Sequence, residues 1–443
     1  MYKIVLLGVG STHFTKGIIE SIIKYGGKWD LRMVDINENC LDIALNLGKR
    51  MVEHYKADVK ISGSTNRLDV LEGADAVVST IGVGGRKAWE QDVFMFRQFN
   101  IYQSTGDTFG AGGISRAIRT IPALLDIAGD MEKHCKEALL VNFTNPMSVC
   151  CQALNKYSKI KTIGLCTGVT SFQSLLAGLI NAPASDTWVK AVGFNHFTWI
   201  TDFTYKGENA WPLIRAAIDN NPDVRSRNPY SWELFDVFGA YPTVGDEHIA
   251  EFMPGMQAKG AYYGKSFGVD SKYRSFTEYA KRWDDIFDEM ADQAYGRKPL
   301  SLIDYNAAGD TFRDEDVFID VLMAYIGDGP PVERTVNLPN NGVIHNLPAD
   351  AILEVTTLVN KIGFHPYSYG TMPPGINAIL QRIAASHTLT VEASVSGDKN
   401  MVIQALMADS VALFKQDAEK IADCILNTHK DYLPHFNIER GKG

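Results

Sequence analysis

The stretch "KIVLLGVGS", residues 3–11, decides the fold, because a continuous apolar run ends there in two glycines, Gly8 and Gly10. Short apolar runs of this kind are typical of strands that are buried on both faces, as in parallel sheets. The residues that follow, 11–26, carry apolar side chains at helical spacing. Strand, glycine turn and helix in this order bring backbone N–H groups to a helix N-terminus, where a pyrophosphate can bind.

The rest of the N-terminal half repeats this alternation. Further apolar runs end in "VDIN" (34–37), "STIGVGG" (79–85), "VNFTNP" (141–146) and "GLC" (164–166), and segments of helical period lie between them. The alternation predicts a parallel sheet that is covered by helices on both faces. From about residue 185 the pattern changes to alternating strands and then to mostly helical segments. We therefore predict two domains, 1–185 and 186–443.

The composition is that of a globular protein that handles small molecules. The 443 residues have a formal net charge of -9 and no run of Lys and Arg, which argues against nucleic-acid binding. No apolar run reaches the roughly 18 to 20 residues that span a bilayer. The six cysteines are irregularly spaced, and the first residues have the pattern of a strand and not of a signal peptide, so we expect a cytoplasmic protein.

Asp35 ends the second predicted strand. In dinucleotide-binding folds a carboxylate at this place accepts hydrogen bonds from a ribose, and it favours NAD over NADP because it repels a 2'-phosphate. Asp35, together with Gly8, Gly10 and Ser11, predicts an NAD site. The third glycine of the usual motif is missing, so an ordinary strand–turn–helix without a nucleotide is the alternative.

Cys166 and His196 each follow an apolar strand, and both strands should end near the same cleft. Thiolate and imidazole are good ligands for a borderline divalent ion, so a metal site is one interpretation. The alternative is a cysteine that fills the core and a histidine that serves as an ordinary polar group. A nucleophilic cysteine is less favoured, because no Asn or Asp partner can be identified to complete it.

Polar residues mark two further places. Asn142 and Asn145 stand where a strand stops at Pro146, and their amides can bind sugar hydroxyls or the nicotinamide carboxamide, or they can simply form a turn. In "GDEHIAEF" (245–252), Asp246 either takes part in the chemistry or begins a helix as its N-cap.

These motifs, in order with "GDTFGAGGISRAIRTIP" (106–122), "GFNHFTW" (193–199) and "VNLPNNGVIHNLPADAILEV" (336–355), resemble glycoside hydrolase family 4. The resemblance runs from residue 3 to about residue 415 and implies a Rossmann-type α/β domain like that of lactate and malate dehydrogenases, followed by an α+β domain. It also implies dependence on NAD and a divalent metal, and a redox route in place of the usual two-carboxylate mechanism. In that route NAD oxidises the sugar at C3, the C2 proton leaves, the aglycone is eliminated, water adds, and the hydride returns.

The resemblance also assigns roles residue by residue. The expected NAD-binding residues are Gly8, Gly10, Ser11, Asp35 and Asn142; the substrate-binding residues are Asn145, Thr167 and Asn195; the ligands of a Mn²⁺-type ion are Cys166 and His196. The base at C2 is expected to be Asp246, with Tyr241 as its rival. Thr167 stands where some members carry an acid, so we consider Asp107 as the proton donor, with a loop-capping carboxylate as its alternative role.

The branches that act on 6-phosphosugars carry an arginine where this chain has Trp89, so we expect an unphosphorylated galactoside or glucoside. The anionic C6 group of a uronide or a sulfoquinovoside could instead pair with one of six cations: Arg86, Lys87, Lys259, Lys265, Lys272 and Arg274. We expect a homodimer or homotetramer. The rival functions are a lactate/malate-type dehydrogenase of a 2-hydroxy acid, which needs no metal, and a non-catalytic NAD-binding sensor.

Overall fold

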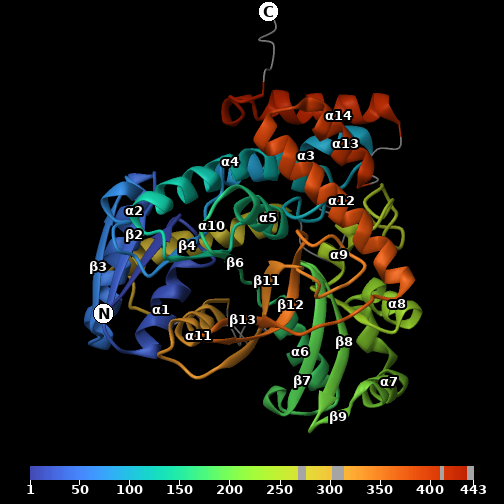
Figure 1. The fold of residues 1–443 in the computed structure, drawn as a ribbon, viewed down its shortest axis with the longest axis horizontal. Coiled ribbons are helices and arrows are strands. Elements are labelled where there is room, and N and C mark those ends of the chain that lie inside the picture. Colours follow the sequence, from blue (N-terminus) through green and yellow to red (C-terminus); the bar gives the residue numbers. More distant parts are fainter. Residues whose placement is uncertain (268–275, 302–313, 410–413, 437–443) are drawn as a thin grey trace, which may run out of the picture.

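The computed structural model describes residues 1–267, 276–301, 314–409 and 414–436. Within these residues the strands form one continuous sheet, in the order β10-β8-β7-β12-β11-β6-β5-β4-β1-β2-β3, with β9 beside β8 and β13 beside β12. Figure 1 shows the strands of the N-terminal half on the left and those of the C-terminal half on the lower right. The predicted α/β fold is confirmed.

The N-terminal half is a parallel sheet between two layers of helices. Its strands are β1 (Tyr2–Leu7), β2 (Trp29–Val34), β3 (Val59–Ser64), β4 (Ala76–Ser79), β5 (Leu139–Asn142) and β6 (Thr162–Gly164). Its helices are α1 (Thr15–Tyr25), α2 (Glu38–Tyr55), α3 (Gly85–Phe94), α4 (Gly110–His134), α5 (Met147–Tyr157) and α6 (Gly168–Leu179). One face of the sheet packs on α1 and α2, and the other packs on α4 and α5. The continuous apolar runs of the strands follow from this burial on both faces.

The C-terminal half adds antiparallel strands and most of the remaining helices. The strands are β7 (Thr187–Phe194), β8 (Phe197–Tyr205), β9 (Glu208–Asn209), β10 (Tyr241–Thr243), β11 (Val332–Pro339), β12 (Ile352–Asn360) and β13 (Gly363–Pro366). The helices are α7 (Trp211–Asn220), α8 (Pro229–Phe238), α9 (Asp246–Phe252), α10 (Phe276–Ala294), α11 (Asp314–Ile326), α12 (Pro374–Ser396), α13 (Lys399–Ala408) and α14 (Lys415–Thr428).

The two halves share this sheet. Strand β11 pairs with β6 of the N-terminal half, at Asn337 and Gly164, and with β12 on its other side. Helix α12 runs across α4 and α5 and carries α13 and α14 at the top of Figure 1. The predicted boundary near residue 185 lies just before β7, but it separates two parts of a single sheet.

Helix α10 crosses the turns that follow the N-terminal strands. His13, in the turn after β1, packs edge-on against Trp283 of α10 with the ring centroids 5.1 Å apart. Arg86, at the start of α3, forms an ion pair with Asp284 and donates a hydrogen bond to the carbonyl oxygen of Ala280 at 3.1 Å. The helix therefore flanks the side of the sheet where the nucleotide is expected.

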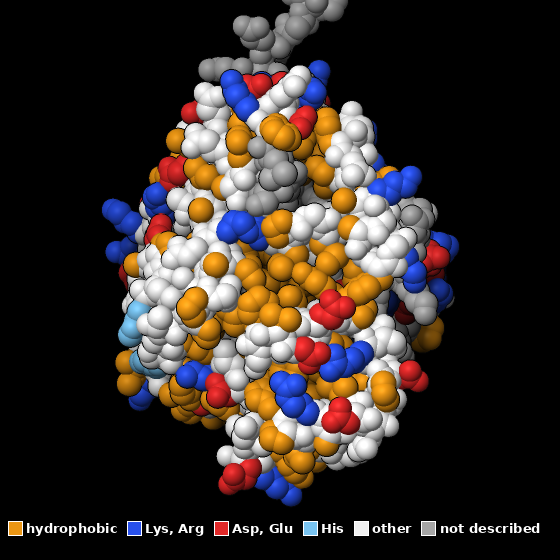
Figure 2. Space-filling model, turned by 90° about the vertical axis from the view of Figure 1, so that its right-hand side faces the viewer, with side chains coloured by type: hydrophobic (Ala, Val, Ile, Leu, Met, Phe, Trp, Pro, Cys, Tyr) orange, Lys and Arg blue, Asp and Glu red, His pale blue; other side chains and the backbone are white. Residues whose placement is uncertain are grey.

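Figure 2 shows the face that lies at the right of Figure 1, over the helices of the C-terminal half. Hydrophobic side chains gather in the middle of this face, and the charged side chains lie around them. Among the helices of the described residues, none has both the length and the hydropathy that crossing a membrane requires.

Candidate active site

The residues expected to bind a nucleotide lie together in the turn after β1. Gly8 has a φ of 86°, and a Cβ added there would lie 3.0 Å from the backbone N of Ile81, so a larger residue does not fit. The backbone N of Gly10 donates a hydrogen bond to Oδ2 of Asp35 at 2.7 Å. The turn thus has a carboxylate beside its glycines, as an NAD-binding turn requires.

Two other residues expected to bind NAD make local hydrogen bonds. Oγ of Ser11 accepts a hydrogen bond from the backbone N of Phe14 at 3.3 Å, at the start of α1. Asn142 is buried, and its amide donates to the carbonyl oxygen of Thr144 at 2.9 Å and accepts from the backbone N of Thr144 at 3.2 Å. These bonds shape the turn after β5, which agrees with the alternative role of Asn142.

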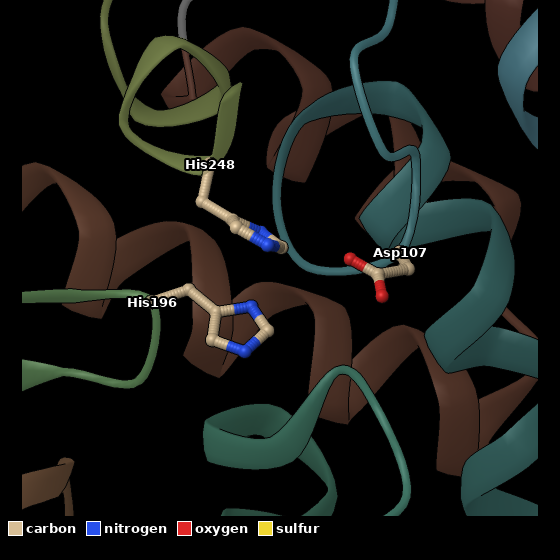
Figure 3. A group of neighbouring side chains, drawn as sticks. All are labelled: Asp107, His196 and His248. Atoms are coloured by element: carbon tan, nitrogen blue, oxygen red, sulfur yellow. The ribbon is translucent and has the colours of Figure 1, made fainter. Parts of the chain in front are cut away.

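Asp107, His196 and His248 converge (Figure 3), and Asp107 is bonded to Asn145, just after the end of β5. We call these three residues the Asp–His–His cluster. Their possible ligand atoms all lie within 4.8 Å of one another. Carboxylate and imidazole groups are ligands that Mn²⁺ and similar divalent ions accept, so the donor set fits a metal site.

Each member of the cluster comes from a different element. Asp107 lies in the loop before α4, and His248 lies in the first turn of α9. His196 forms the tip of the β7–β8 hairpin and has a φ of 66°, which turns its side chain toward the cluster. Oγ1 of Thr108 lies 2.7 Å from Nδ1 of His196. Metal-binding histidines commonly have such a hydrogen bond at the ring nitrogen that does not bind the metal, and it fixes the orientation of the ring.

Glu251 holds the loop that carries Asp107. It lies on α9, three residues after His248, and its carboxylate is buried. The carboxylate accepts hydrogen bonds from the backbone N of Thr105 at 2.8 Å and from the backbone N of Gly106 at 2.6 Å. Helix α9 therefore supplies one member of the cluster and positions another.

Asp107 is held in its charged form. Burial alone would raise the pKa of this carboxyl group, but its electrostatic interactions with His248, then with His196 and Arg116, hold the pKa below its usual value. Glu251 behaves in the opposite way, because burial and the charge of Asp107 raise its pKa to about 7. A carboxylate that stays charged suits a metal ligand better than a proton donor.

Two residues expected to bind substrate border the cluster. Nδ2 of Asn145 donates a hydrogen bond to Oδ2 of Asp107 at 3.1 Å. Asn195 directly precedes His196 and is 1% exposed, yet neither amide atom of its side chain has a hydrogen-bond partner among the described residues. An unsatisfied buried amide is costly, so a ligand that satisfies Asn195 would bind favourably.

Cys166 lies after the end of β6, at the expected place. Its Sγ accepts a hydrogen bond from the backbone N of Gly168 at 3.4 Å, and its side chain packs beside Met147 and Cys151. Thr167 is the residue before α6. Cys166 is outside the Asp–His–His cluster, so its pairing with His196 on one ion stays a prediction.

Asp246 has the hydrogen bonds of a structural carboxylate. It accepts from the backbone N of Tyr230 and of Ser231 at 2.8 Å each, from Oγ of Ser231 at 2.6 Å and from the hydroxyl of Tyr262 at 2.7 Å. Tyr230 and Ser231 begin α8, whereas the N-cap of its own helix, α9, is Gly245. The idea that Asp246 caps its own helix is therefore wrong: it caps the neighbouring one. Burial, opposed by these hydrogen bonds, raises the pKa of Asp246.

Tyr241, the rival base, is fully buried among aromatic rings. Its ring centroid lies 4.6 Å from that of Trp232, 5.8 Å from that of Phe172 and 6.1 Å from that of Phe235. Both candidate bases thus pack against α8, while His248 faces the other two members of the cluster.

Replacing Asp246 with alanine is expected to lower the free energy of unfolding by about 2–3 kcal/mol, because buried donors at the start of α8 lose their acceptor. Urea denaturation measures this change. Asp398, the N-cap of α13, is the matched control, since its exposed side chain accepts one hydrogen bond from Asn400, and its loss should cost about 1 kcal/mol. A variant without Asp246 that is fully stable but inactive would instead identify this carboxylate as the base.

The segment "DEHIAE" (246–251) contains His248 and Glu251, but from the sequence we predict only Asp246 of this segment as a site residue. A spacing of three residues places His248 and Glu251 on one face of a helix, which is the signal that could have identified them together. Their partners at residues 105–107 are more than 100 positions away in the chain, and the periodicity of a helix carries no information about them.

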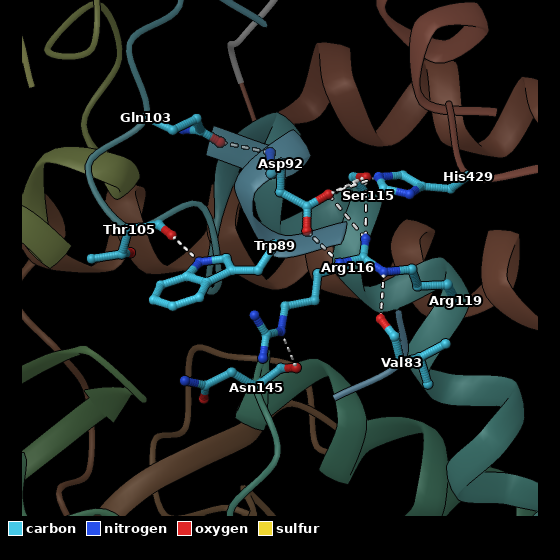
Figure 4. A network of polar contacts seen from close by, with 11 residues as sticks. Val83, Trp89, Asp92, Gln103, Thr105, Ser115, Arg116, Arg119, Asn145 and His429 are labelled. Carbon is cyan, nitrogen blue, oxygen red and sulfur yellow. Dashed lines mark hydrogen bonds and ion pairs between the residues drawn. The ribbon is translucent and has the colours of Figure 1, made fainter. Parts of the chain in front are cut away.

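Behind the cluster, helices α3 and α4 share a buried network of charges (Figure 4). Arg119 pairs with Asp92, and both side chains are almost fully buried. Nε of Arg119 donates to the carbonyl oxygen of Val83 at 3.1 Å, and Nε2 of His429 lies 3.1 Å from Oδ1 of Asp92. The network fixes α4 and, with it, the loop that leads into this helix.

Comparisons with known proteins identify the relatives of this chain. The α-galactosidase of Bacillus subtilis is 28% identical over 452 residues, which cover 98% of this chain and 100% of that protein. An α-galacturonidase of Bacillus subtilis is 30% identical over 379 residues, which cover 80% of this chain and 82% of that protein. A 6-phospho-α-glucosidase from gut microorganisms, solved in complex with NAD and Mn²⁺, has the same fold, with a TM-score of 0.82, 18% identity, and coverage of 98% of this chain and 100% of that one.

The family models agree with these relatives. Residues 3–182 match the family 4 glycosyl hydrolase model, and residues 191–412 match the model of the C-terminal domain of the same family. Together the two matches cover most of the described structure, including the NAD turn and the Asp–His–His cluster. The chain belongs to family 4 of the glycosyl hydrolases.

Proposed function

We propose that this glycoside hydrolase cleaves an unphosphorylated hexoside by the redox elimination and addition of its family, with NAD and a divalent ion of the Mn²⁺ type. The observation that supports this most is the Asp–His–His cluster. Its Asp107 is bonded to Asn145, just beyond the carboxyl end of β5, and the glycine turn of residues 8–11 follows β1 at the same edge of the parallel sheet. A hydride acceptor and a Lewis acid are the two groups that oxidation at C3 and proton loss at C2 require. This placement favours the redox glycosidase over a metal-free dehydrogenase and over a sensor.

The residues present fit both groups. When bound, NAD accepts and returns the hydride of C3, and the ion supplies a Lewis acid for the C3 oxygen. The turn of Gly8 and Gly10 with Asp35 would hold the dinucleotide, and Asp107, His196 and His248 would hold the ion. For Cys166 to bind the same ion, as expected, either Cys166 or the residues of the Asp–His–His cluster would have to move.

The chain's own groups would orient the sugar. Asn145 lies against Asp107 and can present its side-chain oxygen Oδ1, which has no hydrogen-bond partner among the described residues, to a sugar hydroxyl. Asn195 offers a complete amide in the same way. Thr167, beside Cys166, remains a proposed substrate contact, and Asp246 or Tyr241 remains the proposed base, on the condition that α8 moves to admit it to the site.

Trp89 supports the choice of an unphosphorylated sugar. Nε1 of its indole donates a hydrogen bond to the carbonyl oxygen of Thr105 at 2.7 Å, so the ring lines the loop that carries Asp107 (Figure 4). An indole has no charge to bind a phosphate. Of the six cations considered for an anionic C6 group, Arg86 is paired with Asp284, Lys87, Lys259 and Lys265 are exposed, and Lys272 and Arg274 lie outside the described residues.

A cytoplasmic location and a homodimer or homotetramer are part of this proposal. All six cysteines of the chain are free, which agrees with a reducing compartment.

The proposal is tested by the hydrolysis of 4-nitrophenyl α- and β-glycosides, each with and without NAD and Mn²⁺. The panel comprises the glucoside, galactoside, glucuronide, galacturonide, sulfoquinovoside and 6-phosphoglucoside. We expect cleavage of at least one unphosphorylated member only when NAD is present, and no preference for the 6-phosphate. Cleavage that is independent of NAD, or restricted to the 6-phosphoglucoside, would contradict the proposal.

A further inference from the structure

Arg116 is a cation at the site that forms no ion pair with a carboxylate among the described residues. It lies on α4 and is half-buried, and its Nε donates a hydrogen bond to the carbonyl oxygen of Asn145 at 3.1 Å (Figure 4). Among the described residues no carboxylate lies within ion-pair distance of its guanidinium, and the two terminal nitrogens make no hydrogen bond. A guanidinium keeps its charge in any protein environment, so Arg116 offers unused donors.

The contrast with Arg119, three residues later on the same helix, shows what a structural arginine looks like in this chain. Arg119 is paired with Asp92, and its Nη1 also donates to Oδ1 of that carboxylate at 3.0 Å. Its Nε has a carbonyl acceptor as well. A buried charge needs such compensation, because burying it without a partner is costly. Arg116 is only half-buried and bonds a single carbonyl oxygen, so its terminal nitrogens remain available to a ligand.

Asp107 cannot fully neutralise the charge of Arg116 once an ion occupies the Asp–His–His cluster. Asp107 attracts Arg116 electrostatically, but the same carboxylate belongs to the Asp–His–His cluster. An ion in the cluster would bring two further positive charges to Asp107. The positive charge beside Asn145 then exceeds the negative charge, and an anionic group of the ligand would restore the balance.

We propose that Arg116 binds the carboxylate of a hexuronide, so that the proposed reaction acts on a uronide in preference to a neutral hexoside. This inference rests on the proposed function. The planar guanidinium and a carboxylate form two parallel hydrogen bonds, a geometry for which the two free terminal nitrogens are suited. An oxyanion of the cofactor is the other possible source of the same chemistry, because a Cβ at Gly82, in the turn after β4, would lie 3.9 Å from Nη2 of Arg116.

The position of Arg116 favours the sugar over the cofactor as the source. Its bond to Asn145 directs the guanidinium to the end of β5, beside the cluster, whereas the turn expected to hold the pyrophosphate follows β1. Asn145 also donates to Asp107, and the indole of Trp89 donates to Thr105 in the same loop (Figure 4). A carboxylate held there would lie next to the reacting part of the site.

The test compares kcat/KM for the nitrophenyl galacturonide with that for the galactoside in Arg116→Gln, Arg116→Lys and the wild type. We expect the ratio of the two values to fall about 100-fold in Arg116→Gln, mainly through KM, since a hydrogen-bonded charge pair is lost. Arg116→Lys should recover part of the ratio. Arg225→Gln is the matched control, because this arginine pairs with Asp236 at 2.5 Å, away from the site, and its ratio should equal that of the wild type.

Three results would overturn the inference. One is a wild-type enzyme that prefers the galactoside. Another is an unchanged ratio in both Arg116 variants. The third is an unchanged ratio with a weaker Kd for NAD, measured by calorimetry, which would assign Arg116 to the cofactor. If the Arg116→Gln chain does not fold, inhibition of the wild type and of Arg116→Lys by free galacturonate and galactose gives the same comparison. A wild type that cleaves no glycoside with NAD would instead reject the proposed function.

Discussion

Replacing His196 with alanine is expected to reduce the affinity for Mn²⁺ by more than about 100-fold and kcat by about 1,000-fold. The loss of a direct ligand exceeds the roughly 10- to 100-fold effect of losing a residue that only bonds to a ligand, and the loss of electrostatic stabilisation accounts for the fall in rate. His196 is the residue on which the sequence motif and the geometry of the cluster agree. Calorimetry with Mn²⁺ and steady-state hydrolysis measure the two effects.

His365 provides the control for this variant. It is an exposed histidine on β13, where its Nε2 lies 3.3 Å from Oδ1 of Asn360, and its replacement by alanine should change neither quantity. An unchanged Mn²⁺ affinity in His196→Ala would contradict the assignment of the cluster. Substitution with Co²⁺ shows whether Cys166 is also a ligand. A thiolate-to-metal charge-transfer band would add Cys166 to the ligands, and the absence of this band would leave Asp107, His196 and His248 as the protein ligands.

Replacing Gly113 with alanine is expected to reduce kcat/KM about 100-fold. A Cβ at this position would lie 2.6 Å from the carbonyl carbon and 2.7 Å from the carbonyl oxygen of Thr108. Because the atoms of Thr108 that the Cβ would meet belong to the backbone, no side chain can rotate to make room. The loop must therefore move away from α4. This movement displaces Asp107 and the contact between Thr108 and His196, and a displacement of about 1 Å can cost about 100-fold in rate.

Gly129, on the same helix, is the matched control for Gly113. Nothing lies within 4 Å of a Cβ added at Gly129, so its change to alanine should leave kcat/KM unchanged and stabilise the helix by up to about 1 kcal/mol. Full activity in Gly113→Ala would show that the loop absorbs the shift and that its position is not critical.

The sequence predicted the elements whose signal is local. The strand at residues 2–7 is buried on both faces, so its apolar run, its end at Gly8 and the following helix could all be predicted from periodicity. The ends of the apolar runs likewise predict where β5 and β6 end. Asn145 and Cys166 are therefore expected at the carboxyl ends of the parallel strands. Residues that follow parallel strands share one edge of the sheet, whatever the helices between them do.

The arrangement of the C-terminal half depends on contacts that are distant in sequence. Strand β11 lies beside β6 although about 170 residues separate them, and no pattern within either strand encodes the pairing. The same holds for α9, which brings His248 to Asp107 and His196 and places Glu251 against the backbone of Thr105 and Gly106. The cap that Asp246 provides to α8 is likewise a contact between helices, and local sequence could only suggest a cap for α9.

We propose that the glycosidic bond is broken through transient oxidation at C3 and removal of the C2 proton. Hydrolysis of the preferred nitrophenyl glycoside in D₂O, with NAD and Mn²⁺, tests it directly by nuclear magnetic resonance of the released sugar. We expect deuterium at C2 of the product and a rate that depends on NAD, which is not consumed. Cleavage that leaves hydrogen at C2 and proceeds without NAD would contradict it.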